Sequence, residues 1–366
     1  MTDRLDELSP PSEVGSDLSP RERRVLEAVV RLYVSTAEPA GSRNVVRTFD
    51  FDVSAATVRN TMSDLEEKGY LLHPHASAGR IPTDRAYRTF VDHLMRPARL
   101  AEADKKHLAR ELEGVGTSGV ERLVRQAIRA LGVLSQELGV AAAPRLQDGV
   151  LDRLELVRIS SNKVLLVAQI RSGLIRTVYV DLPCEVPDDT LVTLTLLLNE
   201  RLAGLTLKEI RETVAERIRD AARDDDSTVD QVLNIFMQSG PDLFDWPEVE
   251  SGAVHLGNAS VLASQPEFSS GAGLKGLLEL TERRELLASV LAHRAHPAGL
   301  HITIGRENAS EELAGFTLVT SEYRVGDLKG VIGVIGPTRM PYEKVVAIVD
   351  YTSSLVNQML SWSDSS

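Results

Sequence analysis

The chain has 366 residues and a formal net charge of −12, and its composition is 43% hydrophobic and 26% charged. These values are typical of a soluble globular protein long enough for two or three domains, each with its own core. No apolar run approaches the roughly 18 residues of a membrane-spanning helix, and the first residues lack the apolar core of a secretion signal, so we expect no membrane association and a cytoplasmic location. The single cysteine, Cys184, excludes an internal disulfide and a cysteine-based zinc site.

The acidic charge is not spread evenly along the chain. From Leu18 to Arg96, twelve Lys and Arg residues stand against ten Asp and Glu, which gives +2, whereas the whole chain carries −12. A protein that binds nucleic acid needs a local basic surface, because phosphates supply most of the electrostatic attraction. If this chain binds nucleic acid, the first hundred residues are therefore the place to look.

The N-terminal part predicts a tail followed by three helices. Residues 1–17 are rich in Asp, Glu, Ser and Pro and are typical of a disordered tail. Ser19 and Glu22 form a capping-box pattern, and Pro20 suits the first position of a helix. Three helices are predicted, each preceded by a serine as N-cap: 20–35 after Ser19, about 43–48 after Ser42, and 55–68 after Ser54. Gly69 suits the left-handed conformation at the C-terminal end of the third helix.

The stretch HPHASAGRIPTDRAYR, residues 73–88, has three interpretations. His73 and His75 are possible metal ligands, but no convincing third ligand lies near them. SAGR is a possible phosphate loop, but it lacks the double-glycine or GK[ST] pattern. The favoured interpretation is a hairpin with short strands at 71–72 and 80–81, followed by a helix at about 84–95 that Thr83 caps. Helix, short helix, helix and hairpin is the order of a winged helix-turn-helix.

The third helix has two different faces. Placing residues at 100° steps puts Val58, Met62 and Leu65 on one buried face. The opposite face is small and polar, which lets a helix approach a major groove while Arg and Asn side chains read base edges. The alternative for Arg59 and Asn60 is a merely exposed or capping pair. The predicted DNA contacts are Ser42, Arg43, Ser54, Thr57, Arg59, Asn60, Ser63, His75 and Arg80, the last two reaching phosphates or the minor groove.

A charged linker and an apolar helix are predicted after residue 96. Residues 97–118 are charged and predict a linker that is at least partly helical. An apolar seam then steps alternately by four and three residues, which buries one helix face against a sheet or another helix. Packing within a domain is favoured over a coiled-coil dimer because the pattern lasts less than three heptads. The seam consists of Val120, Val124, Ala127, Leu131, Leu134 and Leu138.

Two sets of short runs predict strands, separated by mostly helical sequence. The strands lie at 154–157, 164–167 and 177–180, as an antiparallel meander, and then at 301–304, 316–319 and 330–335. Helices are expected over about 190–237 and 341–360. This order suggests one α+β domain interrupted by an insertion, although periodicity alone leaves two separate domains equally open.

Several motifs resemble one known family. EPAGSR (38–43), SAATVRNTMSDLEEKGYL (54–71) and PHASAGRIPTDRAYR (74–88) look like the signature of the HrcA family of heat-inducible transcription repressors. GNASVLASQPEF (257–268) and GVIGVIGPTRMPYEKV (330–345) are similar to the C-terminal half of that family. The resemblance spans about residues 18 to 360. It departs from the common pattern at Ala76, where Thr is frequent, and at Arg85-Ala86, where Lys-Gly is frequent.

The resemblance implies a multidomain α+β protein in three parts. These are an N-terminal winged helix-turn-helix (18–96), a GAF-like antiparallel sheet domain in two segments (119–185 and 295–362), and an inserted, mostly helical dimerisation domain (186–294). It also implies a homodimer that binds an inverted-repeat operator in double-stranded DNA, represses chaperone operons under normal conditions, and is kept active by the GroEL chaperonin. It implies no catalytic residue, metal or cofactor.

Two other functions remain as alternatives. A metabolite-responsive winged-helix regulator would bind a small effector in its GAF-like domain. An enzyme is disfavoured because no nucleophile–base pair or carboxylate set is present beyond the two histidines at 73 and 75.

Overall fold

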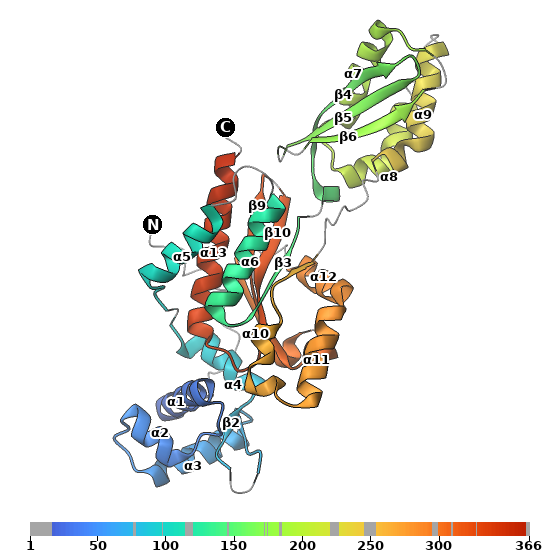
Figure 1. Ribbon diagram of the computed structural model, residues 1–366. Coiled ribbons are helices and arrows are strands. Elements are labelled where there is room, and N and C mark those ends of the chain that lie inside the picture. The colour runs from blue at the N-terminus through green and yellow to red at the C-terminus, as the bar shows by residue number, and fades with distance from the viewer. Residues whose placement is uncertain are drawn as a thin grey trace.

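The structure is a computed structural model. It describes residues 17–75, 78–96, 98–113, 120–144, 146–171, 173, 175–182, 185–219, 227–244, 254–294, 299–308, 310–326 and 328–363. The predicted disordered tail, apart from Asp17, and Cys184 lie outside these residues. Figure 1 shows an N-terminal unit, a central unit and an outlying unit that lies apart from the other two. Within the described part of the chain, no helix is long and apolar enough to cross a membrane.

The N-terminal unit, residues 17–96, has the predicted order of elements. Its helices and strands are α1 (Pro20–Thr36), α2 (Ser42–Phe49), α3 (Ala55–Glu67), β1 (Leu71–Leu72), β2 (Ile81–Pro82), α4 (Asp84–Thr89) and a π-helical turn at Phe90–Leu94. The helix predicted at 84–95 is therefore an α-helix of one and a half turns that widens into the π-helical turn.

Most of the predicted helix ends are confirmed. Ser19 and Glu22 form the reciprocal capping box, in which the Ser19 backbone N–H donates to the Glu22 carboxylate at 2.7 Å. The Ser54 hydroxyl caps α3, and Thr83 caps α4. Gly69 has a φ of +76°, which glycine adopts at little cost. The prediction that Ser42 caps α2 is wrong, because the N-cap is Gly41 and Ser42 is already the first helical residue.

The central unit, residues 98–144 and 254–363, is built on a five-stranded antiparallel sheet in the order β7-β3-β10-β9-β8. Its strands are β3 (Leu138–Ala142), β7 (Val254–Leu256), β8 (Leu300–Ile304), β9 (Phe316–Val325) and β10 (Leu328–Pro337). Helices α6 (Val120–Ser135) and α13 (Tyr342–Ser363) pack on one face of the sheet. The other face is covered by α11 (Gly271–Glu282), α12 (Arg284–His293) and the short α10 (Ser260–Ala263).

The predicted apolar seam packs within this unit. Val124, Ala127 and Leu131 of α6 are buried against α13 and the sheet. Leu138, expected to extend the helical seam, instead begins β3, because the helix ends at Ser135. The chain turns so tightly here that a Cβ on Gly139 would lie 2.1 Å from the Ile128 carbonyl oxygen. The predicted linker contains α5 (Glu102–Glu113), which packs on α6 through buried leucines.

The outlying unit, residues 146–244, has its own sheet and its own core. The predicted meander is confirmed as β4 (Leu151–Ser160), β5 (Lys163–Ile170) and β6 (Ile175–Asp181), in that order in a separate three-stranded sheet. Helices α7 (Asp188–Leu202), α8 (Leu207–Arg219) and α9 (Ser227–Leu243) share its apolar core.

The predicted division of the chain at residues 185 and 186 is therefore wrong. Val180 and Leu182, before that boundary, are buried in one core with Leu191 and Leu194, after it. Fully buried side chains alternate along β5 with mostly half-buried ones, and the helices α7 to α9 cover the buried face. The late strands instead join β3 through β10, and β3 pairs on its other edge with β7, which had been assigned to the insertion.

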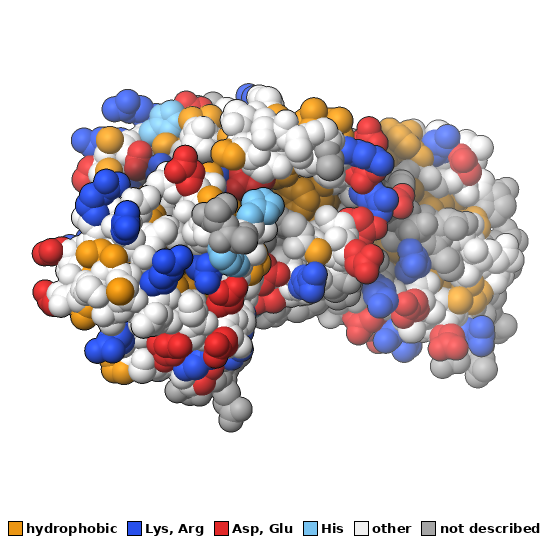
Figure 2. All heavy atoms as spheres, turned by 90° about the horizontal axis from the view of Figure 1, so that it is seen from below, with side chains coloured by type: hydrophobic (Ala, Val, Ile, Leu, Met, Phe, Trp, Pro, Cys, Tyr) orange, Lys and Arg blue, Asp and Glu red, His pale blue; other side chains and the backbone are white. Residues whose placement is uncertain are grey.

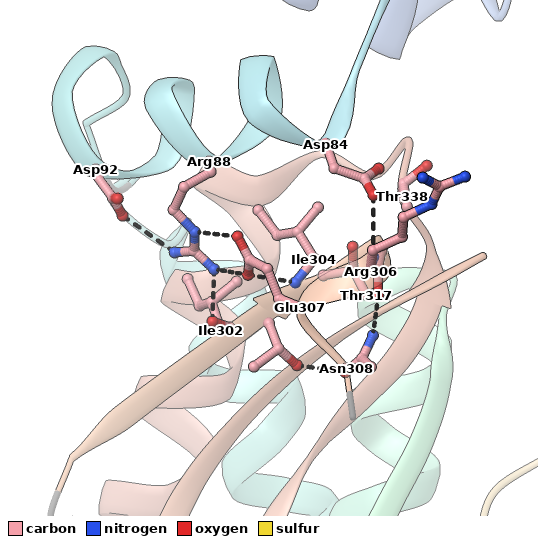
Figure 3. Close-up of polar contacts among 12 residues, drawn as sticks. Asp84, Arg88, Asp92, Ile302, Ile304, Arg306, Glu307, Asn308, Thr317 and Thr338 are labelled. Atoms are coloured by element: carbon pink, nitrogen blue, oxygen red, sulfur yellow. Dashed lines mark hydrogen bonds and ion pairs between the residues drawn. The ribbon is translucent and has the colours of Figure 1, made fainter. Parts of the chain in front are cut away.

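The N-terminal unit is fixed to the central unit by charged contacts around Arg88 (Figure 3). The Arg88 guanidinium binds both carboxylate oxygens of Glu307, at 2.8 Å from Nε to Oε1, and donates to the Ile302 carbonyl at 2.7 Å. Asp84 accepts a hydrogen bond from the Arg306 backbone N–H at 3.0 Å. Burial opposes the charge of Arg88, but its hydrogen bonds to Glu307 outweigh this and raise its pKa.

A second charged contact and an apolar core join the same two units. Arg31 of α1 binds the Glu343 carboxylate of α13 with two hydrogen bonds of 2.9 and 2.6 Å. Arg339 donates to the Val34 carbonyl near the end of α1 at 2.8 Å. The buried side chains of α1, α3 and α4 form one continuous cluster with those of α6 and α13. The N-terminal unit is thus a packed part of the molecule.

We expect Arg88 and Glu307 to stabilise the fold as a pair. Their side chains are 20% and 34% exposed, so the substitutions Arg88→Met and Glu307→Gln should show a coupling free energy of about 1–2 kcal/mol in a double-mutant cycle, below that of a fully buried pair. Chemical denaturation of the four proteins measures it. The matched cycle at the exposed pair Lys105 and Glu102 should show no measurable coupling. Additive effects at Arg88 and Glu307 would contradict the pairing.

Candidate nucleic-acid interface

Helix α3 has one buried face and one exposed face, as the helical pattern predicts. Val58, Met62 and Leu65 are buried against the rest of the N-terminal unit. Arg59 and Asn60 are exposed on the opposite side, as are Ser54 and Ala56, while Thr57 and Ser63 are half-buried. The helix therefore presents small side chains and two long polar ones to the outside.

Arg59 and Asn60 are the side chains of α3 that stay available for a ligand. Among the described residues, neither has a side-chain hydrogen bond or ion pair. The hydroxyls beside them are partly used by the helix itself. The Ser54 hydroxyl accepts from the Thr57 N–H at 3.1 Å and lies 3.0 Å from its hydroxyl, and Ser63 donates to the Arg59 carbonyl at 3.2 Å.

Charge is distributed unevenly along α3. The first turn has no acidic residue, whereas Asp64, Glu66 and Glu67 all lie in the second half. The unsatisfied N–H groups of a helix N-terminus also favour anions. Figure 2 views the molecule from the end that carries the N-terminal unit and shows basic and acidic side chains interspersed there. The N-terminal half of α3 is thus its electrostatically suitable end for a phosphate backbone.

Helix α2 adds a second basic position. Arg43 is exposed in its first turn and has no ion pair among the described residues. Ser42 beside it is half-buried, and the buried Val45 anchors the helix against α3.

The predicted hairpin is present, with its second strand at Ile81–Pro82 in place of the predicted 80–81. Leu71 pairs with Pro82 and Leu72 with Ile81. Arg80 also forms a bridge with Ala40, through N–H to carbonyl bonds of 2.8 and 2.9 Å. A Cβ on Gly79 would lie 2.4 Å from the Ala40 carbonyl oxygen, so this close approach requires glycine. The EPAGSR segment therefore contacts the hairpin through a single bridge between Ala40 and Arg80.

The two histidines have different surroundings. The His73 ring Nε2 lies 2.9 Å from the Ala78 carbonyl oxygen, so this side chain closes the hairpin. His75 is exposed. In the described ranges, no group of three or more His, Cys, Asp or Glu residues is placed to hold a metal ion.

Arg80 is held by a carboxylate that the sequence analysis did not consider. Its guanidinium forms an ion pair of 2.7 Å with Glu66 of α3, and its side chain is only 17% exposed. Its Nε is buried without a hydrogen-bond partner. The pair ties the hairpin to α3, and no spacing rule predicts it because the partners lie on different elements.

Other cations of this unit are also neutralised. Lys68 binds Glu22 at 2.8 Å, and this hydrogen bond lowers the pKa of the Glu22 carboxyl. Arg85 pairs with Asp17, whose pKa is lowered chiefly by a hydrogen bond from Tyr70. Arg31 and Arg88 face the central unit. The count of twelve cations therefore overstates the basic surface available to DNA.

Comparisons with known proteins agree over nearly the whole chain. A family model described as "HrcA protein C terminal domain" matches residues 121–346. Proteins named "Heat-inducible transcription repressor HrcA" are 36% identical in Chlorobium phaeobacteroides (strain BS1) and 32% identical in Geobacter sulfurreducens, and each match covers 94% of this chain and 99% of the relative. A crystal structure of a hypothetical protein at 2.2 Å resolution has a TM-score of 0.56 at 20% identity, covering 94% of this chain and 99% of that chain, which shows a shared fold.

These similarities define the class of protein as a transcription repressor, which is not an enzyme. The chain belongs to the HrcA family of heat-inducible transcription repressors. A repressor of transcription acts on DNA, so the exposed face of α3 and the adjacent hairpin become the first surface to test.

The capping bond of Ser54 makes a stability prediction. Ser54→Ala removes the acceptor for the Thr57 N–H and should lower the free energy of unfolding by about 1 kcal/mol. Ser42→Ala is the matched control, because Ser42 makes no capping bond and its loss should change stability by less than about 0.5 kcal/mol. Thermal denaturation compares the two. Equal effects of the two substitutions would show that the cap contributes nothing.

Proposed function

We propose that residues 18–96 are a winged helix-turn-helix that places α3 in the major groove of DNA. The observation that carries this proposal is the pair Arg59 and Asn60, exposed without partners among the described residues on a helix face that is otherwise small. Bidentate side chains of this kind distinguish base pairs by their edges. The hairpin lies beside α3, where a wing reaches the adjacent backbone or minor groove.

The remaining predicted residues would contact the DNA backbone. Arg43 and His75 are both exposed, which supports contacts of these side chains with phosphates. Arg80 reaches a phosphate only by leaving or sharing Glu66. The proposed backbone contacts are Ser42, Arg43, Ser54, Thr57, Ser63, His75 and Arg80.

We further propose that the repressor binds an inverted repeat as a homodimer. With few unpaired cations, one copy would make few phosphate contacts and bind weakly. Two linked copies add their contacts and match a two-fold symmetric operator. The outlying unit supports this proposal, because four apolar side chains of its sheet are 44–65% exposed: Val157, Ile159, Ile175 and Tyr179. We assign dimerisation to this unit, residues 146–244.

The family assignment supports the regulatory part of the proposal. In this proposal, the repressor acts in the cytoplasm on chaperone operons. The chaperonin GroEL keeps the repressor active until heat diverts the chaperonin to unfolded proteins. The central unit, with one antiparallel sheet between helices, would be the GAF-like domain. Footprinting the purified protein on its own genome fragments, with and without GroEL, tests both the operator and the chaperonin dependence.

The base-reading assignment predicts a loss of discrimination. Arg59→Ala and Asn60→Ala should each reduce the preference for operator over random DNA by about 5- to 150-fold, the equivalent of about 1–3 kcal/mol. Arg129→Ala removes an exposed arginine from α6 of the central unit and should leave the preference unchanged. Competition gel-shift assays measure the ratio. An unaltered ratio in both α3 variants would exclude them as base readers.

Substitutions of Arg80 and Glu66 distinguish two roles for Arg80, phosphate binding and attachment of the hairpin to α3. If Arg80 binds a phosphate, Arg80→Ala should weaken binding to all sequences alike and lower the salt slope by about one, whereas Glu66→Gln should strengthen binding by releasing the guanidinium. If Arg80 only holds the hairpin to α3, both substitutions should weaken binding. Titrations at several salt concentrations, with folding checked by circular dichroism, distinguish these results.

A further inference from the structure

Among the described residues, no carboxylate contacts the guanidinium of Arg294. Arg294 follows the end of α12 and is partly buried over strands β8 and β9. Its terminal nitrogens contact only neutral oxygens among the described residues: the hydroxyl of Thr303, the hydroxyl of Thr320 at 3.4 Å and the side-chain oxygen of Asn308 at 3.5 Å. Burial lowers the pKa of Arg294 to about 10. A buried charge is costly unless it is paired, so this arrangement needs an explanation.

The groups around Arg294 converge on one face of the sheet. Thr303 lies opposite Leu318, and His301 lies opposite Thr320, in the β8–β9 register. Directly opposed residues point to the same side, and the buried Leu318 belongs to the core beneath α12. Two hydroxyls and one imidazole are therefore on the same side of the sheet as the guanidinium.

Asn308 holds this cluster in place. Its side-chain N–H group lies within 3.1 Å of the carbonyl oxygens of Gly305, Leu313 and Phe316, which fixes the orientation of the amide. Its oxygen then accepts from the Thr303 hydroxyl at 2.6 Å. Because Thr303 donates to Asn308, it accepts from Arg294. The scaffold is thus preorganised before any ligand arrives.

The nearby carboxylates are engaged elsewhere. Glu307 acts on Arg294 through its charge, but both of its oxygens are bound by Arg88. Glu322, further along β9 on the same face, binds Arg324 and Lys329. Neither carboxylate contacts the Arg294 guanidinium in the described part of the chain. Among the described residues, the Arg294 Nε makes no hydrogen bond, and it lies beside a terminal nitrogen of the same guanidinium.

We propose that Arg294, whose guanidinium Thr303 and Thr320 hold in position, binds a small oxyanion, either a carboxylate or a phosphate. Nε and a terminal nitrogen of a guanidinium form a planar fork that matches two oxygens of either group. Arg294 remains partly exposed, so such an ion reaches it from solvent. The site lies in the central unit and does not depend on DNA binding.

The experiment titrates the full-length protein with sodium phosphate and, separately, with sodium acetate, against sodium chloride of equal ionic strength. Calorimetry and the shift in melting temperature provide two readouts. We expect saturable binding of one or both oxyanions, and the arm that saturates identifies the group. The variant Arg294→Met should lose at least about ten-fold in affinity, as expected when a charge-assisted bidentate contact is removed. Arg284→Met, on the exposed side of the same helix, should bind as the parent does.

A second variant guards against misfolding of Arg294→Met. Arg294→Lys keeps the charge but not the planar fork, so it should bind more weakly than the parent and more tightly than Arg294→Met. Two results would overturn the proposal. One is that neither oxyanion binds the parent more than chloride does. The other is that a folded Arg294 variant binds with the affinity of the parent, which would leave Arg294 as a clamp that joins α12 to the sheet.

Discussion

The bidentate contact between Arg88 and Glu307 sets the geometry on which the rest of the molecule depends. It joins the helix that follows the hairpin to the edge strand region of the central sheet, and the contact of Arg31 with Glu343 joins α1 to α13. Two such planar contacts, at different points of one interface, fix rotation as well as distance. The orientation of α3 is therefore determined by the central unit. In a dimer, this orientation would decide the spacing at which two copies of α3 meet a duplex.

The same contacts explain how a protein of net charge −12 can present a DNA-binding surface. Several cations of the N-terminal unit neutralise acids inside the protein, while Arg43, Arg47 and Arg59 are among the arginines that remain exposed. A surface with so few cations adds little affinity for arbitrary DNA. Under the proposed function, selectivity then depends on base contacts and on dimerisation, while the acidic remainder of the chain would discourage contact elsewhere.

Local patterns in the sequence predicted local structure well. The Ser19 and Ser54 caps, the buried face of α3, the hairpin and the six predicted strands follow from side-chain chemistry within a few residues, whereas β3 and β7 were not predicted. Contacts between distant segments were not predictable in this way. Leu138 continues an apolar period yet begins a strand, and the meander packs on helices beyond residue 186 instead of joining the late strands. The Arg80–Glu66 ion pair was not predicted for the same reason, because its partners meet only in the folded chain.

The core shared by the N-terminal unit and α13 has a consequence for synthesis on the ribosome. Arg31 and Glu343 are separated by 312 positions, so α1 is made long before the helix that completes its core. Until α13 emerges, Arg31 lacks Glu343, and the apolar cluster that α1 and α4 share with α6 and α13 is incomplete. Nascent chains with such late, long-range contacts fold slowly and expose surface that aggregates. The amount of repressor able to act would then follow the capacity of the cell to protect newly made chains.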